Sequence, residues 1–230
     1  MFILALDTST RGGSVAVTRD AQLLALVRGD AARSHSERLP GEIAAALTEA
    51  GLQRGDIGLL AVATGPGAFT GLRIGLAAMQ GLAMTLGRPV IGISALDALA
   101  AEVAGADLVA PWMDAQRGEV FAMLVDATAG RTLESPLAGD PASVLLSWRA
   151  HLEARTAVFI GDATSRDATL IAAAGAGQWT TRTPPPLAPA LARLAGVRAA
   201  RGEAGLPHQL TPIYVRRPDV EIERERREQP

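Results

Sequence analysis

The sequence predicts an α/β fold built from two related lobes. A short apolar run ends on Asp7, and Arg11-Gly12 then leads into a second apolar run. The same order recurs about half the chain length later, where Asp114 and then Arg117-Gly118 precede an apolar run. The two units align with a shift of one residue, which indicates a duplicated fold. The alternative is a chance resemblance between two unrelated hairpins. Strand-like runs also alternate with segments at helical spacing.

The first half opens with three short strands joined by polar or Gly-rich links, as in a β-meander; they are expected at residues 2–6, 14–18 and 21–28. A helix is predicted at 34–49, because Ser34 and Glu37 match a capping box and apolar residues follow at helical spacing. Further strands are expected at 59–63 and 90–93, and further helices at 72–86 and 97–104.

After Gly105 the pattern begins again, with strands expected at 108–113, 120–125 and 157–160 and a helix at 187–201. Residues 219–230 are a charge run with almost no apolar content, which is typical of disorder. The domains expected are an N-terminal lobe at 1–104, a C-terminal lobe at 105–186, a helix and segment at 187–216 that pack back on the N-terminal lobe, and a disordered charged tail at 217–230.

Composition excludes several kinds of site. The 230 residues carry a net charge of −2, so nothing indicates an independent nucleic-acid-binding protein. The absence of Cys excludes disulfides, thiolate zinc sites and a cysteine nucleophile. The absence of Lys excludes a Schiff-base lysine and a Walker-loop lysine. With no basic leader and no bilayer-spanning run, we expect a cytoplasmic protein without a membrane segment.

Two segments could carry chemistry. Asp7 ends the first strand and is followed by two hydroxyl residues, which could position a metal-bound phosphate; the alternative is a turn stabilised by Asx and Ser/Thr hydrogen bonds. The stretch from Gly65 to Gly75 follows a strand and opens a helix, so its amides could hold an anion. It is neither a Walker loop nor a dinucleotide fingerprint, because the Lys and the glycine spacing are missing.

The helix at 72–86 is apolar on nearly every side, with Arg73 as its only charged residue. Such a helix is either buried all round or shared between the core and a protein interface. The three histidines, His35, His151 and His208, form no His-x-x-x-His pair, so no metal site is predicted. We expect a surface or capping role for His35. No Gly-x-Ser-x-Gly motif supports a hydrolase.

Five segments, in order and across nearly the whole chain, resemble the TsaB (YeaZ) family. They are Leu6-Asp7-Thr8-Ser9, His35-Ser36-Glu37-Arg38-Leu39-Pro40, the loop from Gly65 to Gly75, Met113-Asp114-Ala115-Gln116-Arg117-Gly118-Glu119-Val120-Phe121, and Pro212-Ile213-Tyr214-Val215-Arg216. The Gly65 to Gly75 loop is highly specific. The departures are mild: Ala68 stands where Ser is usual, and Gln116 where Arg is common.

The resemblance implies an actin-like (ASKHA) fold of two lobes, each a mixed sheet with flanking helices. It also implies a non-catalytic subunit that binds and stabilises its paralogue TsaD and works with the ATPase TsaE. TsaD transfers a threonylcarbamoyl group to the adenosine 3′ of the anticodon in tRNAs reading codons that begin with A, so tRNA is reached through the complex. In TsaD a His-x-x-x-His pair binds the metal; it would fall near Ala95 and Leu99 here, so no catalytic or metal-binding residue is expected.

The resemblance also assigns residues. In the family the helix after the Gly-Pro-Gly loop carries the dimer interface, which implies a homodimer when the chain is alone and a rim position for Arg73. The contact residues would be Phe69, Thr70, Arg73, Ile74, Leu76, Ala77, Met79, Gln80, Leu82, Ala83 and Met84. A vestigial nucleotide site, with residual ATP or ADP binding at the complex, would involve Asp7, Thr8, Ser9, Gly65, Gly67 and Asp114. The alternatives are an active ATPase or sugar-kinase-like phosphotransferase that uses Asp7 and Asp114, and a protease, which no motif supports.

Overall fold

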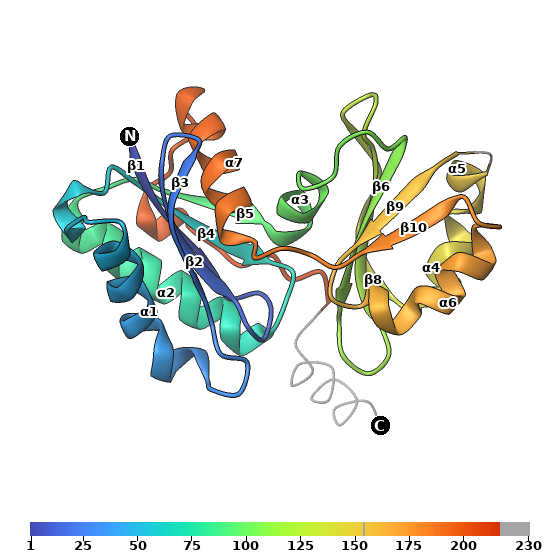
Figure 1. Ribbon diagram of the computed structural model, residues 1–230, viewed down its shortest axis with the longest axis horizontal. Coiled ribbons are helices and arrows are strands. Elements are labelled where there is room, and N and C mark those ends of the chain that lie inside the picture. The colour runs from blue at the N-terminus through green and yellow to red at the C-terminus, as the bar shows by residue number, and fades with distance from the viewer. Residues whose placement is uncertain (154, 217–230) are drawn as a thin grey trace, which may run out of the picture.

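The computed structural model in Figure 1 describes residues 1–153 and 155–216. Two lobes lie side by side, and each is built on a five-stranded sheet. The predicted disordered tail at 217–230 lies outside the described residues.

The two sheets are mixed and have the same topology. Across the first sheet the strands follow the order β3 (Gln22–Arg28), β2 (Ser14–Arg19), β1 (Phe2–Asp7), β4 (Leu59–Gly65) and β5 (Val90–Ser94). Across the second they follow the order β8 (Arg131–Gly139), β7 (Val120–Asp126), β6 (Leu108–Asp114), β9 (Ala157–Ile160) and β10 (Trp179–Arg182).

The predicted repeat is confirmed by strand pairing. β1 pairs antiparallel with β2 and parallel with β4, and β6 pairs antiparallel with β7 and parallel with β9. Asp7 and Asp114 therefore end equivalent central strands, and each precedes an equivalent turn. The polar links on which the repeat was recognised lie at the junction of the two lobes.

The helices predicted in the first half of the chain are present, and the second half contains helices that were not predicted. They are α1 (His35–Glu49), α2 (Phe69–Leu86), α3 (Ala95–Ala100), α4 (Pro141–Ser147), α5 (Arg149–Leu152), α6 (Thr164–Ala174) and α7 (Ala188–Ala200), with two short 3-10 turns at η1 (Arg54–Asp56) and η2 (Pro207–Gln209). The capping prediction for α1 is confirmed in part, since the Glu37 carboxylate accepts from the backbone N–H of Ser34 at 3.0 Å. The helix predicted at 97–104 begins earlier, because Ser94 caps α3, and it also ends earlier, at Ala100.

Successive side chains of a strand point to opposite faces of its sheet. Both faces are covered by apolar layers here. On β1, Leu4 and Leu6 pack under α1 and α2, whereas Ile3 and Ala5 face a second core cluster. This second cluster also contains residues of α3, α7 and the second sheet, such as Met113 and Phe121. The inner faces of both sheets therefore share one apolar core at the junction.

The chain returns to the first lobe after the second sheet is complete. α7 packs on β1, β2 and β4 and lies beside β5 in Figure 1. The backbone N–H of Ala188, at the start of α7, donates to the Ser14 hydroxyl at 3.1 Å. The residues after α7 then run along α2 through η2.

Candidate functional site

α2 carries the residues predicted to contact a partner, and it buries one side of itself in its own lobe. Leu76, Met79 and Ala83 are buried in the core cluster between α2 and the first sheet. These three side chains were expected at a protein interface. The apolar face of the sheet covers them instead. The surface that α2 exposes to a partner therefore contains fewer residues than were predicted.

The opposite side of α2 is exposed. It carries Phe69, Thr70, Arg73, Ala77 and Met84, and the side chains of Ile74, Gln80 and Leu82 are half-buried. Met84 is 73% exposed.

Gly81 lies on the same exposed side of α2, one turn after Ala77. A Cβ atom at position 81 would meet nothing within 4 Å. Glycine inside a helix costs about 1 kcal/mol relative to Ala, and nothing in the described part of the chain requires it here. Small residues in successive turns leave a shallow surface on which another helix could rest closely.

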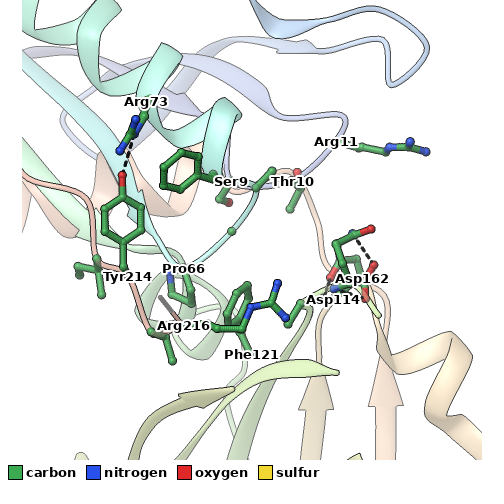
Figure 2. Close-up of a pocket in the computed structure, with 17 residues that line it drawn as sticks. Ser9, Thr10, Arg11, Pro66, Arg73, Asp114, Phe121, Asp162, Tyr214 and Arg216 are labelled. Atoms are coloured by element: carbon green, nitrogen blue, oxygen red, sulfur yellow. Dashed lines mark hydrogen bonds between the residues drawn. The ribbon is translucent and has the colours of Figure 1, made fainter. Parts of the chain in front are cut away.

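The first turns of α2 are held by the C-terminal segment. The Arg73 guanidinium stacks on Phe69 at 3.9 Å from the ring centroid, and its Nε donates to the Tyr214 hydroxyl at 3.0 Å (Figure 2). The rings of Phe69 and Tyr214 pack together with centroids 5.3 Å apart. Gln80 donates to two backbone carbonyls of residues 207–210. Arg73 and Gln80 are thus engaged within their own chain.

A cleft of about 650 Å³ opens between the lobes (Figure 2). Its walls are residues 9–11 after β1, the Gly-Pro-Gly loop, Asp114 with Gln116, Asp162, and residues 213–216. A Cβ at Gly67 would overlap the backbone of Ser9, so only glycine lets the loop pack this closely. Of the predicted nucleotide residues, Ser9, Gly67 and Asp114 line this cleft.

Asp7 adopts the turn conformation that was the alternative to phosphate binding. Its Oδ1 accepts from the backbone N–H of Ser9 at 2.8 Å and from the Ser9 hydroxyl at 2.5 Å, and Oδ2 lies 3.4 Å from the Thr10 hydroxyl. Burial raises the pKa of the Asp7 carboxyl, and the bonds from Ser9 only partly offset this. Asp7 lines a second, smaller cavity of about 390 Å³.

The two other predicted nucleotide residues serve packing. Thr8 is fully buried below α2, with its hydroxyl pressed against Gly75. A Cβ at Gly65 would come 2.8 Å from the carbonyl oxygen of Ile213. Five of the six predicted residues therefore lie at the turn after β1 or at the end of β4, and Asp114 lies at the equivalent turn of the second lobe. Only Ser9, Gly67 and Asp114 line the same cleft.

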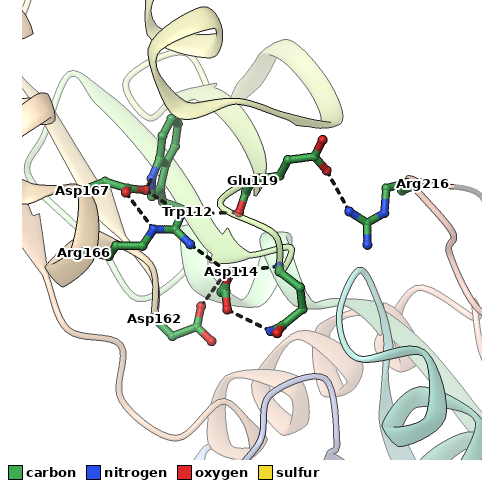
Figure 3. Close-up of polar contacts among 8 residues, drawn as sticks. Trp112, Asp114, Glu119, Asp162, Arg166, Asp167 and Arg216 are labelled. Carbon is green, nitrogen blue, oxygen red and sulfur yellow. Dashed lines mark hydrogen bonds and ion pairs between the residues drawn. The ribbon is translucent and has the colours of Figure 1, made fainter. Parts of the chain in front are cut away.

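Asp114 has both carboxylate oxygens engaged (Figure 3). Oδ1 accepts from Arg166 NH1 at 2.8 Å and from the Gln116 backbone at 3.1 Å, and Oδ2 accepts from the Gln116 side chain at 2.8 Å. Its own N–H donates to Asp162 Oδ1 at 2.9 Å. Burial raises the pKa of the Asp162 carboxyl. Asp114 thus organises the second lobe's turn as Asp7 organises the first.

A buried arginine on α1 holds the turn after β1, and this role was not predicted. Arg38 is 5% exposed; its NH2 group donates to the backbone carbonyls of Arg11 and Gly12, and NH1 pairs with Glu42 at 2.6 Å. The only sequence signal was its place in the family-like segment that begins at His35.

His35 supports the same turn, so the expected surface role is wrong. The ring is half-buried. Nδ1 lies 2.8 Å from Arg38 NH2 and Nε2 lies 3.1 Å from the Thr10 carbonyl oxygen. Because a guanidinium only donates, Nδ1 accepts and Nε2–H donates to Thr10. Burial and then Arg38 lower the pKa of His35, which favours this neutral tautomer.

Comparisons with known proteins identify the family of the chain. The profile of tRNA N6-adenosine threonylcarbamoyltransferase, TsaD, matches residues 27–219. The tRNA threonylcarbamoyladenosine biosynthesis protein TsaB of Bacillus subtilis is 32% identical over 168 residues, which is 72% of each chain. The chain is a TsaB/YeaZ-like member of the TsaD family.

Other similarities extend over more of this TsaB/YeaZ-like chain. An uncharacterized protein of Mycobacterium tuberculosis is 33% identical over 95% of this chain and 93% of its own length. The structure of YeaZ from Pseudomonas aeruginosa superposes with a TM-score of 0.75 and 32% identity over 93% of this chain and 99% of that one. An activator of 2-hydroxyisocaproyl-CoA dehydratase from Clostridium difficile, at 12% identity and a TM-score of 0.53, covers 93% of this chain and 100% of its own and shares the fold. The expected actin-like (ASKHA) fold is confirmed.

The positions at which the TsaD resemblance expects metal-binding histidines hold apolar side chains. Ala95 and Leu99 lie on α3 and are buried in the junction core. Within residues 1–153 and 155–216, no group of three or more His, Asp or Glu side chains could hold a metal ion. In the same part of this TsaB/YeaZ-like chain, none of the helices has the length and apolar character needed to cross a bilayer.

Proposed function

We propose that this chain is a non-catalytic subunit that binds and stabilises a TsaD-type catalytic protein during formation of N6-threonylcarbamoyladenosine in tRNA. The observation that carries the proposal is the exposed side of α2, where Ala77, Gly81 and Met84 form an apolar surface that nothing in the described chain covers. Exposed apolar patches of this kind mark protein interaction sites. Family membership supplies the kind of partner.

The partner surface that we propose consists of Phe69, Thr70, Arg73, Ile74, Ala77, Gly81, Leu82 and Met84. Ala77 and Gly81 lie at its centre, where a partner helix could approach the backbone, and the Arg73–Phe69 stack lies at one end. A hydrophobic centre with a charged group at its edge is the usual anatomy of an interface. Gln80 belongs to the flank, because it is bonded to residues 207–210.

The absence of catalysis is supported by the side chains at the positions where chemistry would be expected. Ala95 and Leu99 have no atoms that bind a metal. Asp7 and Asp114 are occupied by bonds to Ser9, Gln116 and Arg166. These carboxylates stabilise turns, so a structural role explains them without a catalytic one.

The proposed assembly contains further components. A TsaE-type ATPase would join the pair, and tRNAs reading codons that begin with A would be reached through the catalytic partner. In the absence of that partner, the same face of α2 would pair with a second copy of the chain about a two-fold axis. For this function in tRNA modification, the protein would be located in the cytoplasm.

The proposal is tested by mixing the purified chain with the TsaD-type protein of the same genome and measuring mass by size-exclusion chromatography with light scattering. Ala77→Arg, which places a charge in the middle of the surface, is expected to weaken the pair on the order of 100-fold. The matched control is Ala172→Arg, at an exposed position of α6 in the other lobe. Leu76→Arg would not test the surface, because Leu76 is buried in its own lobe and a charge there would disturb folding. A wild-type chain that stays unpaired at micromolar concentration, or equal pairing by both variants, would refute the proposal.

The second candidate is an actin-fold ATPase or phosphotransferase, and the cleft of about 650 Å³ beside Asp114 favours it. It predicts saturable binding of Mg²⁺-ATP that is lost on Asp7→Ala. Isothermal titration of the isolated chain and of the pair decides between the two, and also shows whether residual ATP or ADP binding exists only at the complex.

A further inference from the structure

The C-terminal strap, defined here as residues 205–216, runs along one flank of α2 and ends in the other lobe. At its start the backbone N–H of Val90 donates to the Gly205 carbonyl, and the strap then passes α2 as η2. Leu210 packs against the core cluster under α2 and lies over Gly92, where a Cβ would come 2.9 Å from its side chain. The strap is therefore seated on the first lobe.

The strap is next attached beside the first turn of α2. The backbone N–H of Ile213 donates to the Thr64 carbonyl at 2.7 Å, at the end of β4. One residue later, the Tyr214 hydroxyl accepts from Arg73 and its ring packs on Phe69. Arg73 and Phe69 are on the exposed side of α2, so this part of the strap adjoins the partner surface.

The strap then crosses to the second lobe. Arg216 NH1 lies 2.7 Å from Glu119 Oε2 (Figure 3). Glu119 belongs to the turn between β6 and β7, and its backbone carbonyl accepts from Arg166 at 3.3 Å and from Ala115 at 3.1 Å. Arg166 in turn binds Asp114. The far end of the strap is thus fastened to the same turn that forms the second lobe's wall of the cleft.

We infer that the strap is a brace that sets the angle between the two lobes and couples it to the partner surface of α2. If the lobes separate, Glu119 moves away from β4, and the strap must either release Glu119 or pull on Tyr214. The second alternative disturbs Arg73 and Phe69. A partner that binds these two residues therefore favours the closed arrangement, and lobe closure favours the partner by the same factor. This inference rests on the proposed function for its partner.

The lobe angle can be measured in the isolated chain. Because the sequence contains no Cys, the substitutions Arg54→Cys in η1 and Ala172→Cys in α6 allow spin labels at two exposed positions only, one in each lobe. The distance distribution between the labels is compared among the parent, Glu119→Gln and Tyr214→Phe. Tyr214→Phe removes the hydroxyl that accepts from Arg73. Glu119→Gln removes the negative charge of the Glu119–Arg216 ion pair but leaves an acceptor, and both variants keep the side-chain shape.

The matched control is Glu134→Gln, which removes the charge of an exposed carboxylate that lies 3.0 Å from His151 within the second lobe. We expect Glu119→Gln and Tyr214→Phe to broaden the distribution and to weaken binding of the unlabelled chain to the TsaD-type protein roughly two- to five-fold. Glu134→Gln should change neither quantity. Thermal unfolding of each variant verifies that it is folded.

An unchanged distance distribution in Glu119→Gln and Tyr214→Phe would overturn the brace. A broadened distribution with unchanged partner affinity would overturn its coupling to α2. If the parent chain binds no TsaD-type protein, the proposed function and the coupling fail together, whereas the label distances still decide whether the strap sets the lobe angle.

Discussion

Arg38 and Gly29 lie so close together that a Cβ atom at position 29 would overlap the Arg38 guanidinium. The guanidinium fills the space between α1, the end of β3 and the turn after β1. In that space it donates to the carbonyls of Arg11 and Gly12 and pairs with Glu42. A buried charge of this kind is stable only while all its partners are present.

We therefore expect Arg38→Met to lower the free energy of unfolding by about 3 kcal/mol, because the Glu42 carboxylate and the carbonyls of the turn lose their donor. Urea unfolding followed by circular dichroism measures the change. The control is Arg54→Met on the exposed turn η1, for which a change within about 0.5 kcal/mol is expected. Equal losses in the two variants would show that Arg38 does not hold the turn.

Much of the first lobe could be predicted from the sequence, because its elements carry local signals. The capping box marks α1, and the strand–Asp–turn–strand unit reveals the repeat. The second lobe was predicted less completely. Its edge strand β10 reads Trp-Thr-Thr-Arg with mostly exposed residues, and α6 mixes alanine with polar residues, so neither shows a clear period.

In the candidate site, the sequence predicted residue types and local turns but not the contacts between residues far apart in the chain. The apolar composition of α2 could not indicate which side faces the sheet, so Leu76 and Met79 were expected at an interface that their own lobe excludes. The burial of Arg38 was not predictable, since its carbonyl partner at Gly12 lies 26 residues away in the chain. Sequence patterns identify residue types, whereas such partners appear only in the folded structure.

Two glycines of α2 should respond in opposite directions to the same substitution. A Cβ at Gly75 would overlap the Thr8 hydroxyl, whereas a Cβ at Gly81 would meet nothing within 4 Å. Gly75→Ala is expected to destabilise the chain by about 1–3 kcal/mol through overpacking, and Gly81→Ala to stabilise it by up to about 1 kcal/mol through helix propensity. Urea unfolding of the isolated chain at a concentration where it is monomeric measures both. Two changes of the same sign would contradict the packing of α2 on β1.

The buried carboxyl of Asp7 should make stability depend on pH in an identifiable direction. Its pKa is raised in the folded chain by burial, so the folded state keeps its proton to higher pH than the unfolded state does. The free energy of unfolding therefore falls as pH rises from the ordinary Asp pKa of about 3.9 through the raised folded pKa. Asp7→Asn has no proton to lose and can still accept from Ser9. Its stability relative to the parent should increase across this window and be constant outside it.

Asp126 provides a control of opposite sign. A hydrogen bond from the Ala129 backbone, together with Arg155, lowers the pKa of the Asp126 carboxyl. Its contribution is present above the ordinary Asp pKa and is lost as pH falls through the lower folded value. Asp126→Asn should therefore lose stability relative to the parent as pH rises from acid. Urea unfolding of both variants at a series of pH values checks the two signs, and parallel curves would refute the assignment for Asp7.

Asp167 should stabilise the second lobe mainly through Trp112. The Trp112 ring is fully buried and its Nε1–H donates to Asp167 Oδ2 at 2.8 Å, while Arg166 binds the same carboxylate through two nitrogens. Asp167→Ala leaves the indole N–H without an acceptor and is expected to cost about 2–3 kcal/mol. Asp167→Asn keeps an acceptor and should cost less. Combining Asp167→Ala with Trp112→Phe removes both partners, so the double variant should be more stable than the sum of the single losses by about 1 kcal/mol or more. Additive losses would show instead that the carboxylate acts only through Arg166.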